Sequence, residues 1–286
     1  MAKLPGNEQL RDSSGRALLS LADVNSLPSA EKERLYGGLL PPRLFERFGI
    51  DRATFRGADG NRKIDIIAPA GLGLLRIEVR LHPEDRDRVF FLDLADTRYH
   101  QMELAFCVIC NPDAPRFDVD TDISGRDNCF TTMGRNVPEE VRAMAAGLFP
   151  NQCRRGLGMF GEFFLRLERF VDALGMEMIV AEPLTYDNAI RYEKYGFDYL
   201  TGRRLMQEID RGFQPGGDLF SRLDGSSPFR LPELARTVRG RSWAIHDGIM
   251  DRPWDGVRIY KMVGQSPEID TFPDRDREEA APSKPN

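Results

Sequence analysis

The stretch that decides the fold is residues 152–197, which read QCRRGLGMFGEFFLRLERFVDALGMEMIVAEPLTYDNAIRYEKYGF. It opens with a loop that contains Gly156 and Gly158, and it continues into a segment whose apolar residues recur at helical spacing. That spacing predicts an amphipathic helix, and Gly175 is a typical helix stop. The apolar run Met176–Ala181 then predicts a strand, which a second helical segment follows.

The loop at the start of this stretch has the chemistry of a phosphate site. Glycine has no Cβ, so the backbone at Gly156 and Gly158 can approach a ligand closely. The first amides of the following helix lack intrahelical partners, and together with the helix dipole they favour an anion. Arg154 and Arg155 add positive charges that can pair with phosphate oxygens. No Lys-Ser/Thr pair follows the second glycine, which excludes a Walker loop, and a tight turn without a ligand is the simpler alternative.

Apolar segments on both sides of this stretch predict the strands of a sheet. The predicted strands are Lys63–Ala68, Leu72–Leu81, Arg88–Ala95, Glu103–Cys110, Asp198–Ile209 and Gly256–Val263. Helices are predicted over Arg16–Ala22, from Ser29, over Arg43–Phe48, from Val137 to about Leu148 and over Leu231–Arg239. The sequence therefore predicts a mixed α/β fold with a twisted, mostly antiparallel sheet that helices flank, together with insertions.

The domain organisation follows from shifts in composition along the chain. Residues 1–30 are polar and rich in Gly, Ser and Pro, and we expect a partly flexible arm there. Residues 31–264 are expected to form one domain, with insertions at about 111–150 and 210–255. In the second insertion, an aromatic segment around Trp243 and Trp254 is a candidate cover for a substrate. The charged tail, residues 265–286, is expected to be disordered.

The composition narrows the class of protein. Of the 286 residues, 41% are hydrophobic and 30% are charged, which is typical of a soluble globular protein. The net charge of −5 gives no general attraction to nucleic acid or to an anionic membrane. No apolar run is long enough to span a bilayer, and the first residues lack the apolar core of a signal peptide. We therefore expect a cytoplasmic protein, and its oligomeric state stays open.

The cysteines do not predict a metal site. Cys107 and Cys110 form a C-x-x-C pair, but they lie in a predicted strand, where residues three apart point to opposite faces. No second pair or nearby histidines complete a set of ligands. Reduced thiols are the better interpretation for all the cysteines, Cys129 and Cys153 included.

A run of acidic residues in the first insertion resembles the start of a calcium-binding loop. Asp118, Asp120 and Asp122 have the spacing of an EF-hand, but Ile123 and Cys129 stand at its glycine and closing glutamate positions. Calcium is therefore not expected. On a strand these carboxylates would share one face, either as a solvated edge or as an acidic wall that attracts an amine.

The central stretch resembles the GNAT superfamily of acyl-CoA-dependent N-acyltransferases. Members have an Arg/Gln-x-x-Gly-x-Gly/Ala loop that enters a helix, then a strand, then a helix that ends in Tyr-x-x-x-Gly-Phe. This chain has Gly156-Leu157-Gly158 and, after the helix and strand, Tyr192-Glu193-Lys194-Tyr195-Gly196-Phe197. It departs from the pattern at Cys153, where the family has Arg or Gln, and Asn188 lies closer to Tyr192 than the family's Asn.

The resemblance implies a GNAT-like sheet and a set of site residues. The cofactor-binding residues would be Arg154, Arg155, Gly156, Leu157, Gly158, Met159 and Asn188, with the loop amides on the pyrophosphate of acetyl-CoA or another acyl-CoA. Tyr192 would protonate the departing CoA thiolate, and Glu103 would deprotonate the amine, with Glu78 and Asp93 as alternatives. Without the family pattern, Tyr192 is an ordinary half-buried aromatic at a helix end, and His246 is a weaker candidate base.

The implied reaction is transfer of an acyl group, most simply acetyl, to an amine of a small molecule or a protein in a ternary complex. No metal is implied. One alternative is a non-catalytic module that binds acyl-CoA or a partner protein. Another is an enzyme similar to the long-chain N-acyl amino acid and acyl-homoserine-lactone synthases. The sequence sets neither the acyl chain length nor the acceptor.

Overall fold

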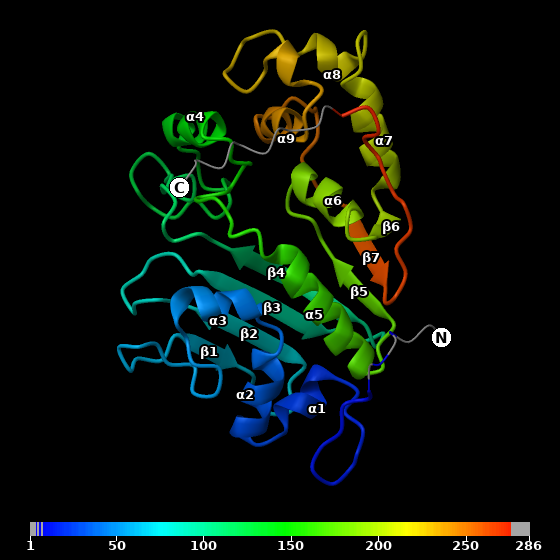
Figure 1. Cartoon of the computed structure of the whole chain (residues 1–286). Helices are drawn as coiled ribbons and strands as arrows, with labels where there is room; N and C mark the ends of the chain where they lie inside the picture. Colours follow the sequence, from blue (N-terminus) through cyan, green and yellow to red (C-terminus); the bar gives the residue numbers. More distant parts are fainter. Residues whose placement is uncertain (1–3, 5, 7, 276–286) are drawn as a thin grey trace. The chain divides into compact units, whose positions relative to one another are not determined.

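The computed structural model describes residues 4, 6 and 8–275 (Figure 1). Three helices come first, α1 (Leu21–Asn25), α2 (Ser29–Gly37) and α3 (Pro42–Phe48). Four strands follow, β1 (Ile64–Ile67), β2 (Leu74–Val79), β3 (Phe90–Asp96) and β4 (Met102–Ile109). The remaining elements are α4 (Val137–Ala145), α5 (Phe160–Ala173), β5 (Met178–Ala181), α6 (Tyr186–Glu193), β6 (Asp198–Thr201), α7 (Arg203–Gly212), α8 (Asp218–Ser221), the 3-10 turn η1 (Pro232–Leu234), α9 (Val238–His246) and β7 (Arg258–Met262).

The strands form a mixed sheet in the order β1-β2-β3-β4-β5-β7-β6. Strands β1 to β4 pair as antiparallel neighbours, whereas β4 and β5 are parallel, with Met102 opposite Ile179. These pairings confirm the predicted mixed α/β class with a mostly antiparallel sheet that helices flank.

The chain divides into two compact units. The first contains residues 1–113, 156–182 and 260–266, and the second contains residues 114–155, 183–259 and 267–286. The chain therefore leaves the first unit after β4 and returns to it just before α5.

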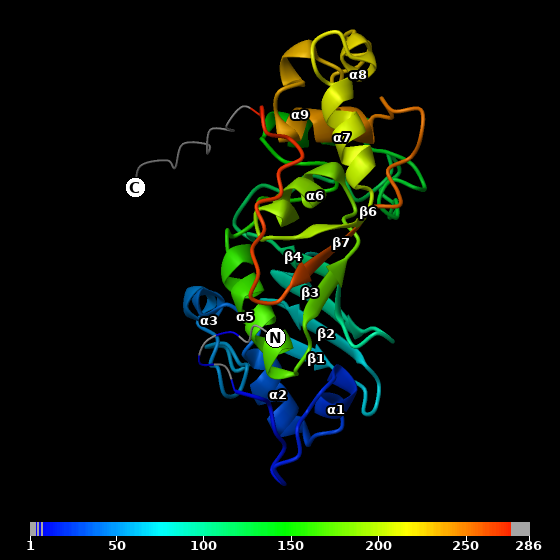
Figure 2. The ribbon, with the colours of Figure 1, turned by 90° about the vertical axis from the view of Figure 1, so that its right-hand side faces the viewer.

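The first unit is a two-layer arrangement in which α2, α3 and α5 lie on one face of β1–β4 (Figures 1 and 2). In β2, Leu75, Ile77 and Val79 are buried, whereas Arg76 and Glu78 alternate with them on the other face. Helix α5 contributes Phe163, Phe164, Leu167, Phe170 and Val171 to the core. The buried side chains of the strands and those of α5 therefore form one core.

The N-terminal segment expected as a partly flexible arm contributes to this core. The amide of Leu10 donates to the carbonyl of Ala173 at 2.8 Å, and Leu18 and Leu21 are fully buried. The helix predicted over residues 16–22 is wrong before Leu21, where α1 begins because Ser20 and Asp96 accept hydrogen bonds from first-turn amides.

The strand predicted over Asp198–Ile209 is wrong beyond Thr201. Gly202 has a φ of +90°, and the chain turns there into α7. Met206, Ile209 and Phe213 are buried at spacings of three and four, which is the pattern of a helix face. The sequence does not show where the strand ends, because the apolar residues of β6 and α7 follow each other without a break in composition.

The helix predicted over Leu231–Arg239 is also displaced. Residues 232–234 form only the turn η1, and α9 begins at Val238 because Thr237 accepts a hydrogen bond from the Gly240 amide at 2.9 Å. Trp243, expected to cover a substrate, is instead fully buried and stacks on Phe229. Trp254 donates to the Pro183 carbonyl at 3.0 Å.

Part of the tail expected to be disordered is packed. Thr271 and Phe272 are buried. The backbone amide and the side-chain hydroxyl of Thr271 both donate to the carboxylate of Glu193. Residues 276–286, which complete the predicted tail, lie outside the described residues, as do residues 1–3, 5 and 7.

Candidate functional site

The loop predicted to bind phosphate lies at the carboxyl end of β4. Cys110 and Gly156 form an isolated antiparallel bridge, which returns the chain to the strand after the long insertion. A Cβ on Gly156 would lie 3.0 Å from the carbonyl oxygen of Ile109, so a larger residue would force a shift. The loop is therefore in contact with the end of β4, although residues 111–155 separate the two in sequence.

Together β4, α5 and β5 form a strand–helix–strand unit with parallel strands. In open sheets of this kind, ligands bind beyond the carboxyl ends of the strands, where the helix N-terminus also lies. Helix α5 begins after Met159, and the side chain of this N-cap residue forms no capping hydrogen bond. Gly156 and Gly158 are exposed, and Gly158 has a φ of +67° that favours glycine. The backbone at this helix start is open to a ligand.

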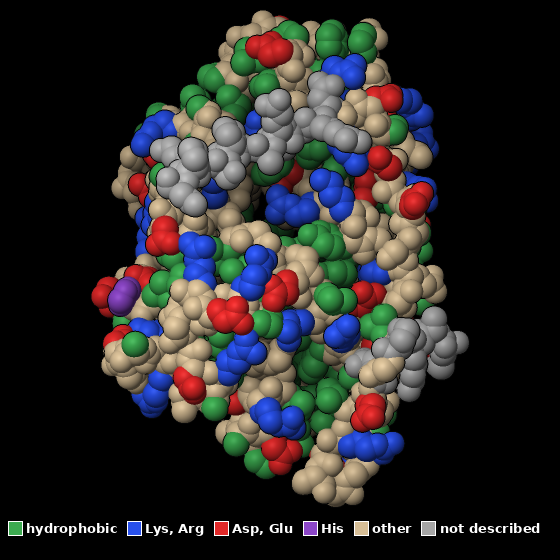
Figure 3. Space-filling model, in the orientation of Figure 1, with side chains coloured by type: hydrophobic (Ala, Val, Ile, Leu, Met, Phe, Trp, Pro, Cys, Tyr) green, Lys and Arg blue, Asp and Glu red, His purple; other side chains and the backbone are tan. Residues whose placement is uncertain are grey.

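An arginine that the sequence did not single out lies at this loop. The guanidinium of Arg43, in α3, donates to the Gly158 carbonyl at 3.2 Å and pairs with Glu162 at 2.9 Å. Arg43 and Gly158 are 115 positions apart, and no motif in the sequence joins them. Acidic and basic side chains are interspersed over this face, which carries α3 and α5 (Figure 3).

The two arginines predicted to bind phosphate belong to the second unit, and their guanidinium groups contact its backbone. Arg154 donates to the carbonyl of Ala114, and Arg155 donates to the carbonyl of Ala146 at 2.8 Å. These contacts account for both side chains without a ligand. Leu157 is half-buried and Met159 is buried, so their contribution to the loop is limited to the backbone.

Tyr192 lies at the end of α6, where the Tyr-x-x-x-Gly-Phe sequence forms a Schellman turn. Gly196 has a φ of +78°, the amide of Phe197 donates to the Tyr192 carbonyl, and the amide of Gly196 donates to the Glu193 carbonyl. The rings of Tyr192 and Phe197 are 4.9 Å apart, which is the apolar contact that accompanies this turn. The motif therefore has a structural explanation of its own.

Asn188 is used locally in the first turn of α6. Its side-chain amide donates to the Thr185 hydroxyl and, at 3.1 Å, to the buried carboxylate of Asp187. Burial raises the pKa of Asp187, and hydrogen bonds from Thr185 and Ser242 only partly offset this. Asn188 thus belongs to a polar cluster between α6 and α9.

Of the three carboxylates proposed as the base, Glu103 is the one whose side chain forms no ion pair with an arginine among the described residues. Asp93 forms two hydrogen bonds with Arg76, each 2.8 Å long. Burial alone would raise the pKa of Glu78, but Arg88 and Arg80 outweigh it and hold that pKa below its ordinary value. Within the described residues, Glu103 has no side-chain hydrogen bond or ion pair, and it is half-buried beside Val180 of β5.

The other candidate base, His246, is part of a buried ion cluster. Its Nε2 lies 3.1 Å from Glu140, and its side chain is only 9% exposed. Arg135 bridges Glu140 and Asp247, and Asp247 also pairs with Arg230. These contacts join α4 to α9, so His246 has a structural role.

The acidic run in the first insertion is neutralised by arginines rather than arranged as a wall. Residues 118–120 form a turn and not a strand; Arg116 pairs with Asp118 and with Asp120, and Asp122 pairs with Arg126. The strand face that was expected to carry either a solvated edge or an acidic wall is therefore absent from residues 118–120.

The cysteines have the arrangement expected from the strand. Cys107 pairs with Leu92 of β3, and two residues separate it from the bridge at Cys110, so the two thiols are on opposite faces. Burial raises the pKa of the Cys107 thiol above its usual value. None of the four cysteines, all within the described range, forms a disulfide.

The predicted site residues thus divide between the units. Glu103 and the loop backbone from Gly156 to Met159 are both in the first unit, but Glu103 is near the start of β4, whereas the loop contacts the end of that strand. Arg154, Arg155, Asn188 and Tyr192 are in the second.

Comparisons add no relative: no family model matches the chain, and no curated protein or solved structure matches it. Among residues 4, 6 and 8–275, every helix is too short or too polar to cross a membrane. In the same residues, no group of three or more His, Cys, Asp or Glu side chains is placed to hold a metal ion.

Proposed function

We propose that this protein is an acyl-CoA-dependent N-acyltransferase of the GNAT type. The observation that carries the proposal is the exposed glycine loop, which contacts the end of β4 and enters α5 at Met159, whose side chain forms no capping hydrogen bond. Backbone amides at the start of a helix suit a diphosphate. Arg43 supplies the cation beside them.

The proposed reaction needs two proton transfers. The lone pair of an amine attacks the thioester carbonyl, a C–N bond forms, and the C–S bond to CoA breaks. Glu103, which has no arginine partner among the described residues, accepts the proton that the amine loses, directly or through water. Tyr192 donates a proton to the departing thiolate. The acyl group is most simply acetyl, and the acceptor is a small-molecule or protein amine.

A non-catalytic module that binds acyl-CoA is the second candidate. The Schellman turn accounts for Tyr192, Gly196 and Phe197 without chemistry. If that is their whole role, the loop would bind CoA and no transfer would follow.

Turnover distinguishes the two candidates. The full chain is incubated with acetyl-CoA, or with a long-chain acyl-CoA, and a panel of amines, and release of the CoA thiol is measured. An enzyme releases thiol only when an amine is present, and the preferred acyl length shows whether it is an acetyl or a long-chain transferase. CoA binding without any amine-dependent release supports the module.

Two variants test the proposed roles. Tyr192→Phe should keep CoA affinity and lower kcat by about a hundredfold, and Glu103→Gln should lower kcat similarly. Tyr99→Phe, at an exposed tyrosine, is the control. An unchanged kcat in Tyr192→Phe rules out its role as the acid.

A further inference from the structure

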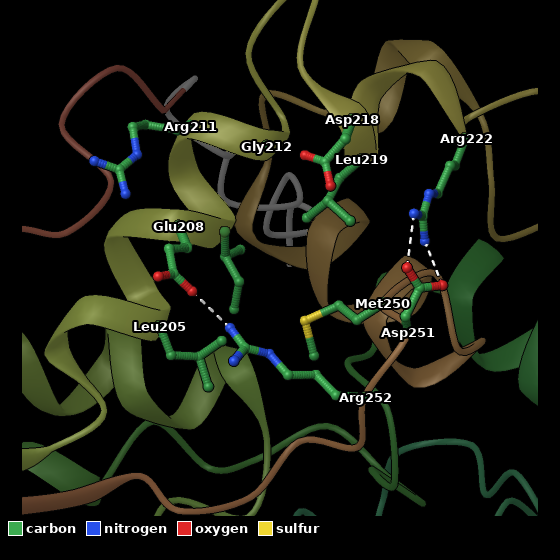
Figure 4. A pocket seen from close by; sticks show the side chains of 11 residues that line it. Leu205, Glu208, Arg211, Gly212, Asp218, Leu219, Arg222, Met250, Asp251 and Arg252 are labelled. Atoms are coloured by element: carbon green, nitrogen blue, oxygen red, sulfur yellow. Dashed lines mark hydrogen bonds and ion pairs between the residues drawn. The ribbon is translucent and has the colours of Figure 1, made fainter.

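The second unit contains a pocket that the proposed reaction does not use. It is an open hollow of about 510 Å³, and α7, α8 and residues 250–252 line it (Figure 4). A Cβ on Gly212 would lie 2.8 Å from Leu219, so the end of α7 packs closely against α8. The walls therefore come from packed elements of one unit.

Charges around this pocket are mostly neutralised by each other. Arg222 and Asp251 form two hydrogen bonds of 2.8 Å, and Glu208 pairs with Arg252 at 2.7 Å. Arg211 is directed away from the hollow (Figure 4). These pairs leave little net charge on most of the rim.

Asp218 is the exception on the rim. Its carboxylate is exposed beside Leu219 (Figure 4), and within the described residues it forms no hydrogen bond or ion pair. Arg222 interacts with Asp218 only at longer range, because its guanidinium is bound to Asp251, and a carboxylate without a hydrogen-bonded partner at the edge of a pocket favours a cation. A ligand carboxylate would instead face Asp218 and have to compete with Asp251 for Arg222.

Only about half of the pocket lining is apolar. The apolar part comes from Leu205, Ile209, Leu219 and Met250, and Met250 has the flexible thioether side chain that adapts to ligands of different shape. A pocket that combines an apolar side with a few polar groups suits a ligand that carries both kinds of group.

We propose that this pocket binds a small amphipathic amine, with its ammonium group on Asp218 and its apolar body against Leu205, Leu219 and Met250. The site is independent of the acyl transfer proposed above, because none of its residues takes part in that reaction. Charge complementarity selects the ammonium, and burial of the apolar body supplies the rest of the affinity.

The test is calorimetric titration of the full chain with phenethylamine, compared with 2-phenylethanol and 3-phenylpropionate. Phenethylamine should bind saturably at concentrations up to about 10 mM, and the alcohol and the acid at least about fivefold more weakly. Asp218→Asn should weaken the amine at least about fivefold, whereas Asp255→Asn, at an exposed acid outside the pocket, should not.

A second pair of variants tests the position of the apolar body. Leu205→Trp should fill the hollow and abolish amine binding, and Leu200→Trp, at an exposed leucine outside the lining, should keep it. Circular dichroism of each variant confirms that it is folded. The proposal is overturned if no amine binding saturates, if alcohol and amine bind equally, or if the folded Asp218→Asn and Leu205→Trp variants bind like the native chain.

Discussion

At the scale of single residues, charged groups in this protein are mostly held by specific partners. Arg76, Arg116 and Arg135 each satisfy carboxylates that the sequence alone presents as free acids. Asp93 pairs with Arg76, and Glu78 pairs with Arg88, so both carboxylates are weaker candidates for the base than Glu103. The sequence alone gives Arg43 no role, but in the structure its guanidinium contacts the glycine loop, which is distant in sequence.

Arg43 and Glu162 should have opposite effects on CoA affinity. Glu162 is the acidic side chain in the first turn of α5, and it pairs with Arg43 where the diphosphate would bind. Arg43→Gln should therefore weaken CoA roughly fivefold, and Glu162→Gln should strengthen it, because one negative charge is removed from the site. The measurement is calorimetric titration with CoA. Arg52→Gln, which breaks an exposed ion pair with Glu46, is the control and should have no effect.

Glu193 gives the stability of the chain a specific pH dependence. Burial raises its pKa above the ordinary value of 4.5, and hydrogen bonds from Thr271 and Tyr199 only partly offset this. A carboxyl with a raised folded-state pKa contributes stability below its unfolded pKa, and that contribution is lost as pH rises through the folded value.

Native chain and Glu193→Gln should therefore differ in the slope of stability against pH. From about pH 5 to pH 8, the free energy of unfolding of the native chain should fall relative to that of the variant. Urea unfolding across this range measures the difference. A difference that stays constant with pH would show that Glu193 ionises in the folded chain as it does in the unfolded one.

At the scale of elements, the period of the apolar residues was the reliable signal. Strands β1 to β4 and helix α5 lie within the predicted ranges or shifted by a residue or two, because each has one face against a common core. The errors occur where a local interaction decides the boundary. Gly202 starts α7, and the Thr237 cap starts α9, and neither changes the apolar composition of its segment.

The end of α6 tests whether the Tyr-x-x-x-Gly-Phe sequence stabilises the fold. Gly196→Ala should cost about 1 kcal/mol of unfolding free energy, because alanine is strained at a φ of +78°. Tyr192→Phe keeps the ring against Phe197 and should cost less than about 0.5 kcal/mol. Urea unfolding measures both, and Lys194→Ala, at an exposed position of the same turn, is the control. Equal costs for Gly196→Ala and Lys194→Ala would contradict the Schellman assignment.

At the scale of the whole molecule, the chain is two compact units, which interleave in sequence. The sequence predicted the insertion between β4 and the loop, but not that residues 114–155 would join residues 183–259 in a unit of their own. Long-range contacts such as Arg135 with Asp247 produce that unit, and periodicity in one segment carries no information about them. For the same reason the sequence could propose the glycine loop and Glu103 but not Arg43.

The most direct test is calorimetric titration of the full chain with CoA, with Gly158→Val and Gly60→Val in parallel. Both glycines have positive φ and open space around them, so the two variants introduce similar strain, but only Gly158 lies in the loop. If the loop binds the diphosphate, CoA should bind saturably to the native chain and to Gly60→Val, and not to Gly158→Val. No binding to the native chain, or equal binding to all three proteins, would contradict it.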